Sequence, residues 1–174
     1  MKSFMFKRIE TLHWGPLIPI QYDNAQRVHV VFINTSYLTT ATAKSLRTDK
    51  PRIKDPYAPI VFGVGFDGVG PHRAYENGKE TRTHGVWRAM LRRCYGAEYR
   101  PAYEGATVCE DWHNFQVFAE WYKSKGGLEH SLELDKDILI KGNKLYHPER
   151  CILVSKQLNL QHRMFARDRK KCVI

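Results

Sequence analysis

The side chains with the clearest chemical potential lie late in the chain, where acids, amides and an imidazole come close together in sequence. Asp135 and Asp137 are two residues apart, and alternate residues of a β-strand point to the same side. Asn143 and His147 follow in a polar stretch, and Asn159 follows in a segment with helical character. If these segments fold back on one another, a carboxylate and an amide oxygen can hold one hard divalent cation and leave positions open for a phosphate. The ordinary alternative is a solvated strand end followed by a simple turn.

The cysteines favour free thiols over a metal or disulfide framework. Cys94, Cys109, Cys151 and Cys172 are widely scattered, and no two of them form a CxxC pair. A structural zinc site usually takes its ligands in close pairs, and a disulfide scaffold needs a denser set. We therefore expect buried thiols in a reduced, intracellular and soluble protein.

A glycine-rich stretch imitates a nucleotide-binding motif. Residues 63–68 satisfy the pattern GxGxxG. The dinucleotide fingerprint requires a helix to begin directly afterwards, so that its amides face the pyrophosphate. Gly70 and Pro71 stand there instead. The glycines are therefore expected to form tight turns.

The composition indicates a globular basic protein. The 174 residues allow one ordinary domain or two small ones, and 43% of them are hydrophobic, enough for a real core. Lys and Arg outnumber Asp and Glu by 28 to 18, a formal charge of +10. Such a surplus points first to nucleic acid, with an acidic partner protein or no polyanion at all as the alternatives. Apolar runs fall short of the roughly 18 to 20 residues of a membrane span, and no signal peptide is recognisable.

The first sixty residues read as β-structure. Residues 28–33 are β-branched and aromatic, with turn formers on both sides. Prolines recur from Pro16 to Pro59 and oppose long helices. A small, strongly bent sheet or barrel is expected here, followed by glycine-rich turns over residues 63–83.

Two amphipathic helices are expected next. The first, about residues 84–95, has an apolar stripe with arginines elsewhere on the wheel. The second, about residues 111–124, would be capped by Asp111 and ended by Gly126 and Gly127. The expected buried positions are Trp87, Met90, Leu91 and Cys94 in the first helix, and Trp112, Phe115, Phe118, Ala119 and Tyr122 in the second.

The remainder reads as strand, turn, strand and helix. Residues 132–140 alternate like a strand with a polar interruption, residues 141–144 form a turn, and residues 151–154 form a second strand. Ser155 could then cap a helix that runs past Asn159 into a basic tail. The expected fold class is α+β, with a β-rich domain over residues 1–60 and a second domain over residues 61–174, whose hairpin and helix occupy about residues 131–164.

Several stretches together resemble a known group of proteins. Residues 87–95, 110–115 and 134–146, with the glycines of residues 63–70 and Gly78, resemble a pattern found in tailed-phage proteins that are labelled HNH or homing endonucleases. The resemblance covers about residues 60 to 160. The first sixty residues are only loosely similar to the β-rich leader of some members.

The resemblance implies a ββα-metal fold that cuts DNA with one divalent ion, Mg²⁺ or Mn²⁺. In such proteins a histidine ending the first strand is the general base, and a carboxylate beside it binds the metal with an amide or imidazole on the helix. By this resemblance Asp135 stands at the carboxylate position and Asn159 at the helix ligand position.

Two positions depart from the pattern. Lys136 stands where the histidine base is expected, and Arg150 where a central asparagine normally holds the loop. A lysine with an ordinary pKa of about 10.4 is a poor base at neutral pH, although it could stabilise phosphate charge. His147 or His130 could supply the imidazole instead. The candidate catalytic set is therefore Lys136, Asp137 and His147.

The expected partner is double-stranded DNA, in the cytoplasm of an infected host cell and away from any membrane. The protein would then be an endonuclease or nickase. The alternative is a degenerate protein of the same fold that binds DNA or inhibits an acidic host protein. The candidate DNA-binding residues are Arg88, Arg92, Arg93, Lys141, Lys144, Arg150, Arg163, Arg167, Arg169, Lys170 and Lys171.

Overall fold

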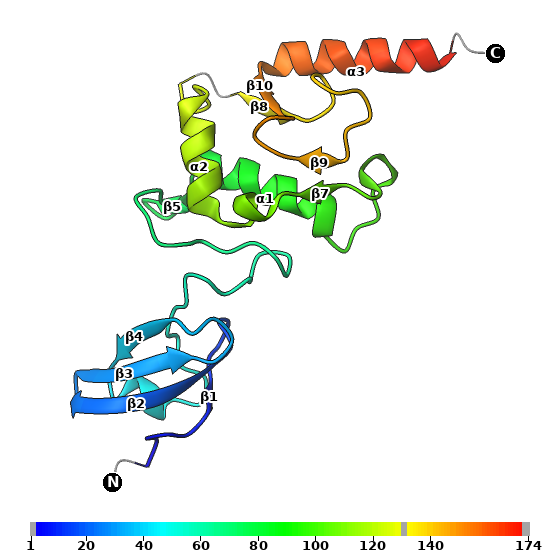
Figure 1. Ribbon diagram of the computed structural model, residues 1–174. Helices are drawn as coiled ribbons and strands as arrows, with labels where there is room; N and C mark the ends of the chain where they lie inside the picture. Colours follow the sequence, from blue (N-terminus) through cyan, green and yellow to red (C-terminus); the bar gives the residue numbers. More distant parts are fainter. Residues whose placement is uncertain (1–2, 130–131, 172–174) are drawn as a thin grey trace. The chain divides into compact units, whose positions relative to one another are not determined.

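The chain divides into two compact units, each with a core of its own. The structure is a computed structural model that describes residues 3–129 and 132–171. The first unit is Met1–Ile60 and the second is Val61–Ile174 (Figure 1). The first is rich in β-structure and the second combines helices with short strands, so the chain as a whole is mixed α and β.

The first unit is built on a four-stranded antiparallel sheet. Its strands β1 (Ile9–Glu10), β2 (Pro16–Asn24), β3 (Arg27–Phe32) and β4 (Leu38–Ala41) lie side by side in chain order. The strand expected at residues 28–33 is therefore confirmed as β3. The register between β2 and β3 shifts at two places, after Pro19 and after Tyr22, and such irregularities bend a sheet.

Alternation along β3 creates the core of the first unit. Val28, Val30 and Phe32 point inward and are buried, whereas the residues between them are half-buried. Leu17 of β2 lies opposite Phe32 and is also fully buried. As the prolines predicted, the helical structure described in this unit is limited to the 3₁₀ turn η1 (Ser45–Arg47).

The glycine-rich stretch forms turns, as expected. Gly63 and Gly68 have φ values of 77° and 70°, a left-handed conformation that favours glycine. The chain then makes a small hairpin of β5 (Tyr75–Glu76) and β6 (Lys79–Glu80), joined through Asn77 and Gly78. No helix begins directly after the glycines, because the next helix described begins at Arg82.

Helix α1 (Arg82–Tyr95) lies close to its expected position but begins two residues earlier. The hydroxyl of Thr81 caps its start by accepting a hydrogen bond from the backbone N–H of His84 at 3.4 Å. Trp87, Met90 and Leu91 are fully buried along the expected stripe, and Cys94 is half-buried.

Helix α2 (Phe115–Ser124) begins later than predicted. The side chain of Asn114 caps it by accepting from the Gln116 N–H at 2.9 Å, so the assignment of the cap to Asp111 is wrong. Asp111 lies instead in the 3₁₀ turn η3 (Glu110–His113). The predicted apolar positions of this segment are all buried, which confirms the stripe; they are Trp112, Phe115, Phe118, Ala119 and Tyr122.

Aromatic rings fill the core of the second unit where α1 meets α2. The indole N–H of Trp87 donates to the backbone oxygen of Trp112 at 2.7 Å, which satisfies a fully buried donor. The ring of Trp112 meets Phe118 edge to face, with centroids 5.1 Å apart. Beyond this core, the 3₁₀ turn η2 (Pro101–Tyr103) precedes β7 (Thr107–Val108), which pairs in parallel with β9 (Leu145–Tyr146).

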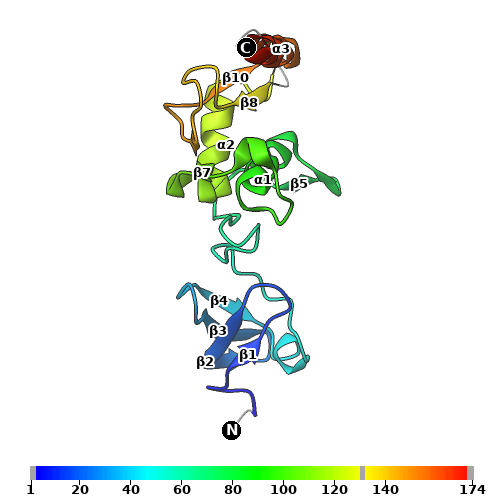
Figure 2. The ribbon, with the colours of Figure 1, turned by 90° about the vertical axis from the view of Figure 1, so that its right-hand side faces the viewer.

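A strand, a long loop, a second strand and a helix complete the chain. Strand β8 (Glu133–Asp135) pairs antiparallel with β10 (Ile152–Val154), and α3 (Lys156–Lys171) follows. Figures 1 and 2 both place α3 beside these two strands. The Ser155 hydroxyl accepts from the Leu158 N–H at 3.2 Å, which confirms it as the helix cap.

Strand β8 is shorter than the strand that the sequence predicts over residues 132–140, since it ends at Asp135. The Asp135 carboxylate accepts hydrogen bonds from the backbone N–H groups of Asp137 and Ile138, at 2.7 and 2.8 Å. These bonds turn the chain away from the sheet, as aspartate side chains often do. Asp135 and Asp137 therefore do not share a strand face.

No helix in the described parts of the chain is both long and apolar enough to cross a bilayer.

Replacing Phe118 by Ala should lower the free energy of unfolding by about 3–5 kcal/mol, because it opens a cavity in a fully buried aromatic cluster. Val117 is the matched control, since it is the next residue of α2 and its side chain is 44% exposed. Val117→Ala should change the free energy by less than about 1 kcal/mol. Urea unfolding followed by tryptophan fluorescence measures both variants. Equal losses would contradict the assigned core.

Candidate functional site

The site begins with a buried contact between helix α3 and strand β8. Asn159 lies in the first part of α3 and its side chain is only 2% exposed. Its amide nitrogen Nδ2 donates to Oε2 of Glu133, the first residue of β8, at 2.7 Å. The Ser155 cap sets where α3 starts and therefore which helical residue meets the strand.

This contact leaves the other atom of the amide without a partner. The Glu133 carboxylate accepts hydrogen bonds, so it fixes the orientation of the Asn159 amide, with the nitrogen toward the carboxylate. The oxygen Oδ1 is buried and accepts no hydrogen bond from any residue that the structure describes. Such an orphaned acceptor costs about 1–3 kcal/mol, and it calls for an explanation such as a bound ion or water.

Asn159 and Glu133 line a cleft of about 470 Å³. Helix α1 also lines it, through Gly85, which has no side chain, and Ala89, whose side chain is a methyl group. Two arginines also line it, Arg82 at the start of α1 and Arg93 near its end. The cleft therefore combines oxygen donors for a cation with guanidinium groups that suit a phosphate.

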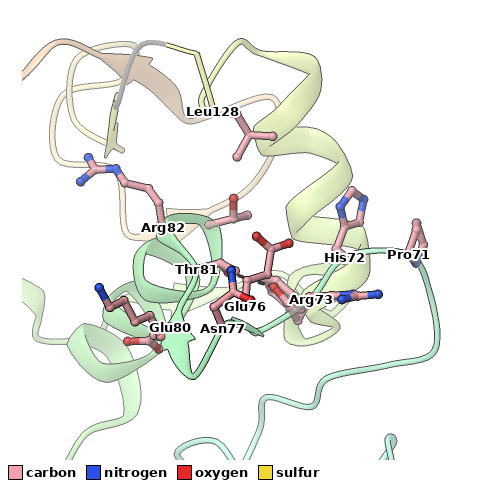
Figure 3. A pocket seen from close by; sticks show the side chains of 12 residues that line it. Pro71, His72, Arg73, Glu76, Asn77, Glu80, Thr81, Arg82 and Leu128 are labelled. Carbon is pink, nitrogen blue, oxygen red and sulfur yellow. Dashed lines mark hydrogen bonds between the residues drawn. The ribbon is translucent and has the colours of Figure 1, made fainter.

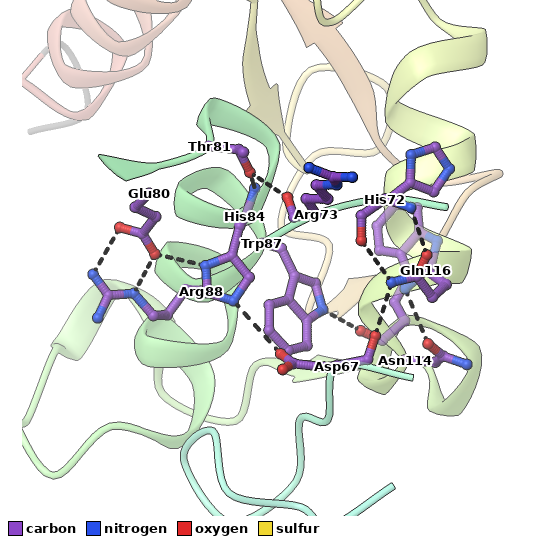
Figure 4. Close-up of polar contacts among 11 residues, drawn as sticks. Asp67, His72, Arg73, Glu80, Thr81, His84, Trp87, Arg88, Asn114 and Gln116 are labelled. Carbon is purple, nitrogen blue, oxygen red and sulfur yellow. Dashed lines mark hydrogen bonds and ion pairs between the residues drawn. The ribbon is translucent and has the colours of Figure 1, made fainter. Parts of the chain in front are cut away.

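The acid on the far side of the cleft is already engaged. Oε1 of Glu80 lies 2.7 Å from the ring Nδ1 of His84 (Figure 4). The same carboxylate pairs with the Arg88 guanidinium, through Oε1 to Nε at 2.9 Å and through Oε2 to Nη2 at 3.0 Å. The His84 ring is 5% exposed, and its other nitrogen faces Asp67 at 4.0 Å. This network fixes the start of α1 and engages both oxygens of the Glu80 carboxylate. The hydrogen bond between Glu133 and Asn159 engages Oε2 alone, so Glu133 is the acid better placed to serve the cleft.

Arg93 does not lie on the outer face of α1, although the sequence predicts it there as a phosphate contact. It is half-buried, with its guanidinium over the Tyr103 ring at 5.8 Å and a hydrogen bond to Tyr146. Burial raises the pKa of Tyr146, so this phenol stays neutral beside the arginine. Arg88 and Arg92 are exposed as expected. Arg93 belongs to the cleft instead.

Asp135, the predicted metal ligand, plays a part in the turn. Its side chain is 8% exposed and its Oδ1 takes the two backbone hydrogen bonds that end β8. It shares a strand face with Glu133, two residues earlier. Sequence reasoning missed Glu133 as the direct partner of Asn159, although the alternation of β8 places it on the same face as Asp135.

Lys136 is held in a closed set of interactions. Its side chain is 5% exposed, and Nζ donates to both carboxylate oxygens of Asp137, at 2.7 and 2.9 Å, and to the backbone oxygen of Asn143 at 2.7 Å. All three N–H groups of the ammonium are used. The interactions indicate that Lys136 and Asp137 tie the loop together, and the catalytic roles expected for them stay predictions.

Asn143 holds the loop between β8 and β10. Its Nδ2 donates to the backbone oxygens of Lys136, Leu145 and Arg150, at 3.0, 2.8 and 3.4 Å. Its Oδ1 accepts from the Leu145 N–H at 3.0 Å. The loop-holding role that the resemblance gives to an asparagine is thus performed here by Asn143, whereas the Arg150 side chain is exposed. The sequence signal for this role is the Gly142–Asn143 pair, which is typical of a turn, and Gly142 has a left-handed φ of 75°.

His147, one of the two candidate bases, lies apart from the cleft lining. His147 is half-buried, and its Nδ1 accepts from the Glu149 N–H at 3.2 Å, within the turn that leads to β10. It is not among the residues that line the cleft. His130 lies outside the described residues.

The remaining predicted DNA contacts are scattered. Lys141 is exposed, and the exposed Lys144 donates to the backbone oxygen of Glu104 at 2.8 Å. The basic residues of the tail belong to the α3 backbone, but their side chains lie outside the described structure; they are Arg163, Arg167, Arg169, Lys170 and Lys171.

A larger cavity of about 750 Å³ lies at the start of α1 (Figure 3). It is bordered by Arg73, Glu76 and Leu128, and it shares the segment 80–82 with the cleft. His72 lies at its edge and pairs with Glu120 at 2.9 Å. Because acids and bases mix along its wall, this cavity shows no clear preference for one class of ligand.

The metal-ligating groups that meet are few and consist of oxygen. Over residues 3–129 and 132–171, no three His, Cys, Asp or Glu side chains gather as they would around a closed metal site. The acid and the amide that meet are Glu133 and Asn159, joined through the amide nitrogen, and both also carry oxygen atoms, the ligand type that Mg²⁺ and Mn²⁺ prefer.

The cysteines are free thiols in the described structure, as the sequence predicted. Cys94 and Cys109 are half-buried and Cys151 is buried. Burial raises the pKa of Cys94 to about 11 and that of Cys151 to about 12, from an ordinary value of 9.0, and it also raises the pKa of Cys109. These thiols are therefore protonated at neutral pH and are poor nucleophiles.

Comparison of the chain with protein-family models, curated proteins and solved structures gives no significant match.

Asn143→Ala should lower the free energy of unfolding by about 3 kcal/mol, because it leaves buried backbone oxygens without donors. Lys141→Ala is the control in the same loop, and because that residue is exposed its effect should stay within about 0.5 kcal/mol. Chemical denaturation measures both. An Asn143→Ala variant as stable as the control would refute the loop-holding role.

Cys151 should react with iodoacetamide at least about 100-fold more slowly in the folded protein than in the denatured chain at pH 8.5. The folded thiol keeps its proton to about pH 12, whereas the unfolded thiol loses it near pH 9. The unfolded state is thus favoured as the pH rises through this range, and stability should fall. Mass spectrometry of the alkylated peptides measures the rates. Similar rates in both states would contradict the burial of this thiol.

Proposed function

We propose that this protein binds double-stranded DNA and hydrolyses a phosphodiester bond with the help of one divalent metal ion, as an HNH-like phage endonuclease or nickase. The observation that carries the proposal is the buried Oδ1 of Asn159, which has no donor among the described residues, on a residue that lines a cleft together with Glu133, Arg82 and Arg93. A cation bound there would give this oxygen a partner and would be attracted by the Glu133 carboxylate. The order of strand, loop, strand and helix supports the proposal.

The roles of the chain's own residues follow from their positions. Asn159 and Glu133 would hold Mg²⁺ or Mn²⁺, with Asp135 on the same strand face. When bound, the ion supplies charge neutralisation at the phosphate and at the departing oxygen. Arg82 lines the cleft, with Nη2 donating to the backbone oxygen of Leu132 at 3.2 Å, and its positive charge would attract a phosphate. Arg93 lines the cleft too, but its guanidinium contacts Tyr103 and Tyr146, so it would contribute charge at a distance.

The general base is the open part of this mechanism. Lys136 stands at the position of the histidine base, and its three N–H donors are all engaged by Asp137 and Asn143. His147 and His130 flank the two strands in sequence and are the imidazoles proposed for the proton transfer; because His147 does not line the cleft, it would act through a bridging water.

The engagement of Lys136 also favours a second candidate function. In that case the chain has kept the fold and the basic surface but lost the base, and it binds DNA, or an acidic host protein, without cutting. The +10 charge serves either function.

Purified protein should nick supercoiled plasmid DNA in the presence of Mg²⁺ or Mn²⁺, and EDTA should stop the reaction. Glu133→Gln and Asn159→Ala should each slow nicking by about 100-fold, because the first removes the negative charge that attracts the ion and the second removes the amide oxygen proposed to hold it. Glu149→Gln is the matched control, since it removes an exposed acid of the same unit and should retain full activity. Circular dichroism checks that the variants remain folded.

Three results separate the candidate functions. Nicking that depends on Glu133 and Asn159 supports the nuclease. DNA binding by the unaltered protein without nicking supports the second function. Nicking that survives both substitutions would contradict the proposed site.

A further inference from the structure

The first unit carries a concentration of positive charge that the proposed cleft does not use. We propose that residues 44–54, here called the basic strap, form a separate surface that binds the phosphate backbone of double-stranded DNA without reading its sequence. The inference rests on the proposed DNA-binding function. The strap has one acid, Asp49, and its basic residues are all exposed; they are Lys44, Arg47, Lys50, Arg52 and Lys54.

The second half of the strap is anchored at every other residue. Pro51, Ile53 and Asp55 are buried, whereas Arg52 and Lys54 between them are exposed. This period of two is typical of an extended chain with one face inward. Ile53 belongs to the core of the first unit, so the backbone that carries Arg52 and Lys54 is anchored by its packing.

Hydrogen bonds fix this extended segment at both ends. The backbone oxygen of Pro51 accepts from the Leu12 N–H at 3.1 Å. The Asp55 side chain is buried, and it accepts from the Thr35 hydroxyl at 2.5 Å and from the Tyr57 N–H at 2.9 Å. A fixed backbone reduces the entropy that is lost when charged side chains settle on a ligand.

The first half of the strap is the 3₁₀ turn η1 and its flanks. Leu46 is buried beneath it, and Thr42 closes the turn by accepting from the Ser45 N–H at 3.1 Å. Lys44 and Arg47 are left exposed on either side of Leu46. The Arg47 guanidinium lies 5.5 Å from the centre of an aromatic ring, that of Phe4, which restricts its motion.

A groove extends the basic surface toward the start of the chain. It has a volume of about 540 Å³ and is lined on one side by Lys7 and Arg8 and on the other by Arg47 and Lys50. Its acids are Asp49 and Glu10, and the latter pairs with Arg8 at 2.8 Å.

The polar character of the strap favours DNA over an acidic protein. Protein interfaces usually have an apolar centre inside a polar rim. The large apolar side chains of the strap, Leu46 and Ile53, are buried, so its exposed face offers charge without such a centre. Binding to a nucleic-acid backbone is mainly electrostatic and needs no apolar centre.

The test measures the salt dependence of binding by the full-length protein to a fluorescein-labelled mixed-sequence duplex of about 30 base pairs. The reaction contains EDTA, so no cleavage is involved. The triple variant Lys50→Gln, Arg52→Gln, Lys54→Gln should bind more weakly. Its slope of log K against log [KCl] should be smaller by about 2 to 3, since each lost phosphate contact lowers the slope by about 0.9.

The matched control removes the same charge from exposed positions of the second unit, as Lys79→Gln, Lys123→Gln, Lys125→Gln. Its slope should stay within about 0.5 of the unaltered protein. Equal losses in the two variants would show a general charge effect and overturn the inference, and so would the absence of DNA binding by the unaltered protein.

A polyglutamate competitor identifies the class of partner. If polyglutamate displaces the duplex as well as unlabelled DNA does, the strap is a surface for acidic protein and the inference is overturned. A strap-dependent salt slope in a protein that never nicks plasmid would support the strap while refuting hydrolysis at the cleft. The two proposals can therefore fail separately.

Discussion

The proposed site depends on one contact, the hydrogen bond from the buried Asn159 amide to the half-buried Glu133 carboxylate where α3 lies against β8. The amide nitrogen is used in this bond, whereas the buried amide oxygen accepts no hydrogen bond from a described residue. The surrounding structure maintains this arrangement. Asp135 ends β8 two residues later, and the Ser155 cap starts α3 so that Asn159 falls on the strand. A site that binds a cation gives this unsatisfied geometry a physical reason.

The loop between β8 and β10 shows how structural and chemical demands divide among neighbouring polar residues. Lys136, Asp137 and Asn143 satisfy one another and the loop backbone almost completely. Groups that are satisfied in this way stabilise a shape and have little capacity left for a ligand. The unsatisfied acceptor lies elsewhere, on α3. In the loop the polar groups are hydrogen-bonded to one another, and they position the site. On α3 the Asn159 oxygen lacks a described partner, and this is the group that would bind a ligand.

The sequence predicted local features well, because they depend on local patterns. The apolar stripes of both central helices and the Ser155 cap follow from spacing and from side-chain chemistry near the backbone. The predictions were wrong where the partner of a side chain depends on tertiary contacts, which the periodicity of the sequence does not reveal. Asp135 captured two backbone N–H groups and ended the strand early, and Arg93 turned inward onto tyrosine rings. The partnership of Asn159 with Glu133 needed the register of α3 on β8, which only the folded arrangement supplies.

The most direct test of the central claim is a crystal structure of the protein soaked in MnCl₂, with anomalous diffraction to locate the metal. The account predicts an anomalous peak within about 2.2 Å of Asn159 Oδ1, in the cleft that it shares with Glu133. Manganese bound only elsewhere, or an Asn159 oxygen that accepts a hydrogen bond from a protein donor in the same crystal, would contradict it.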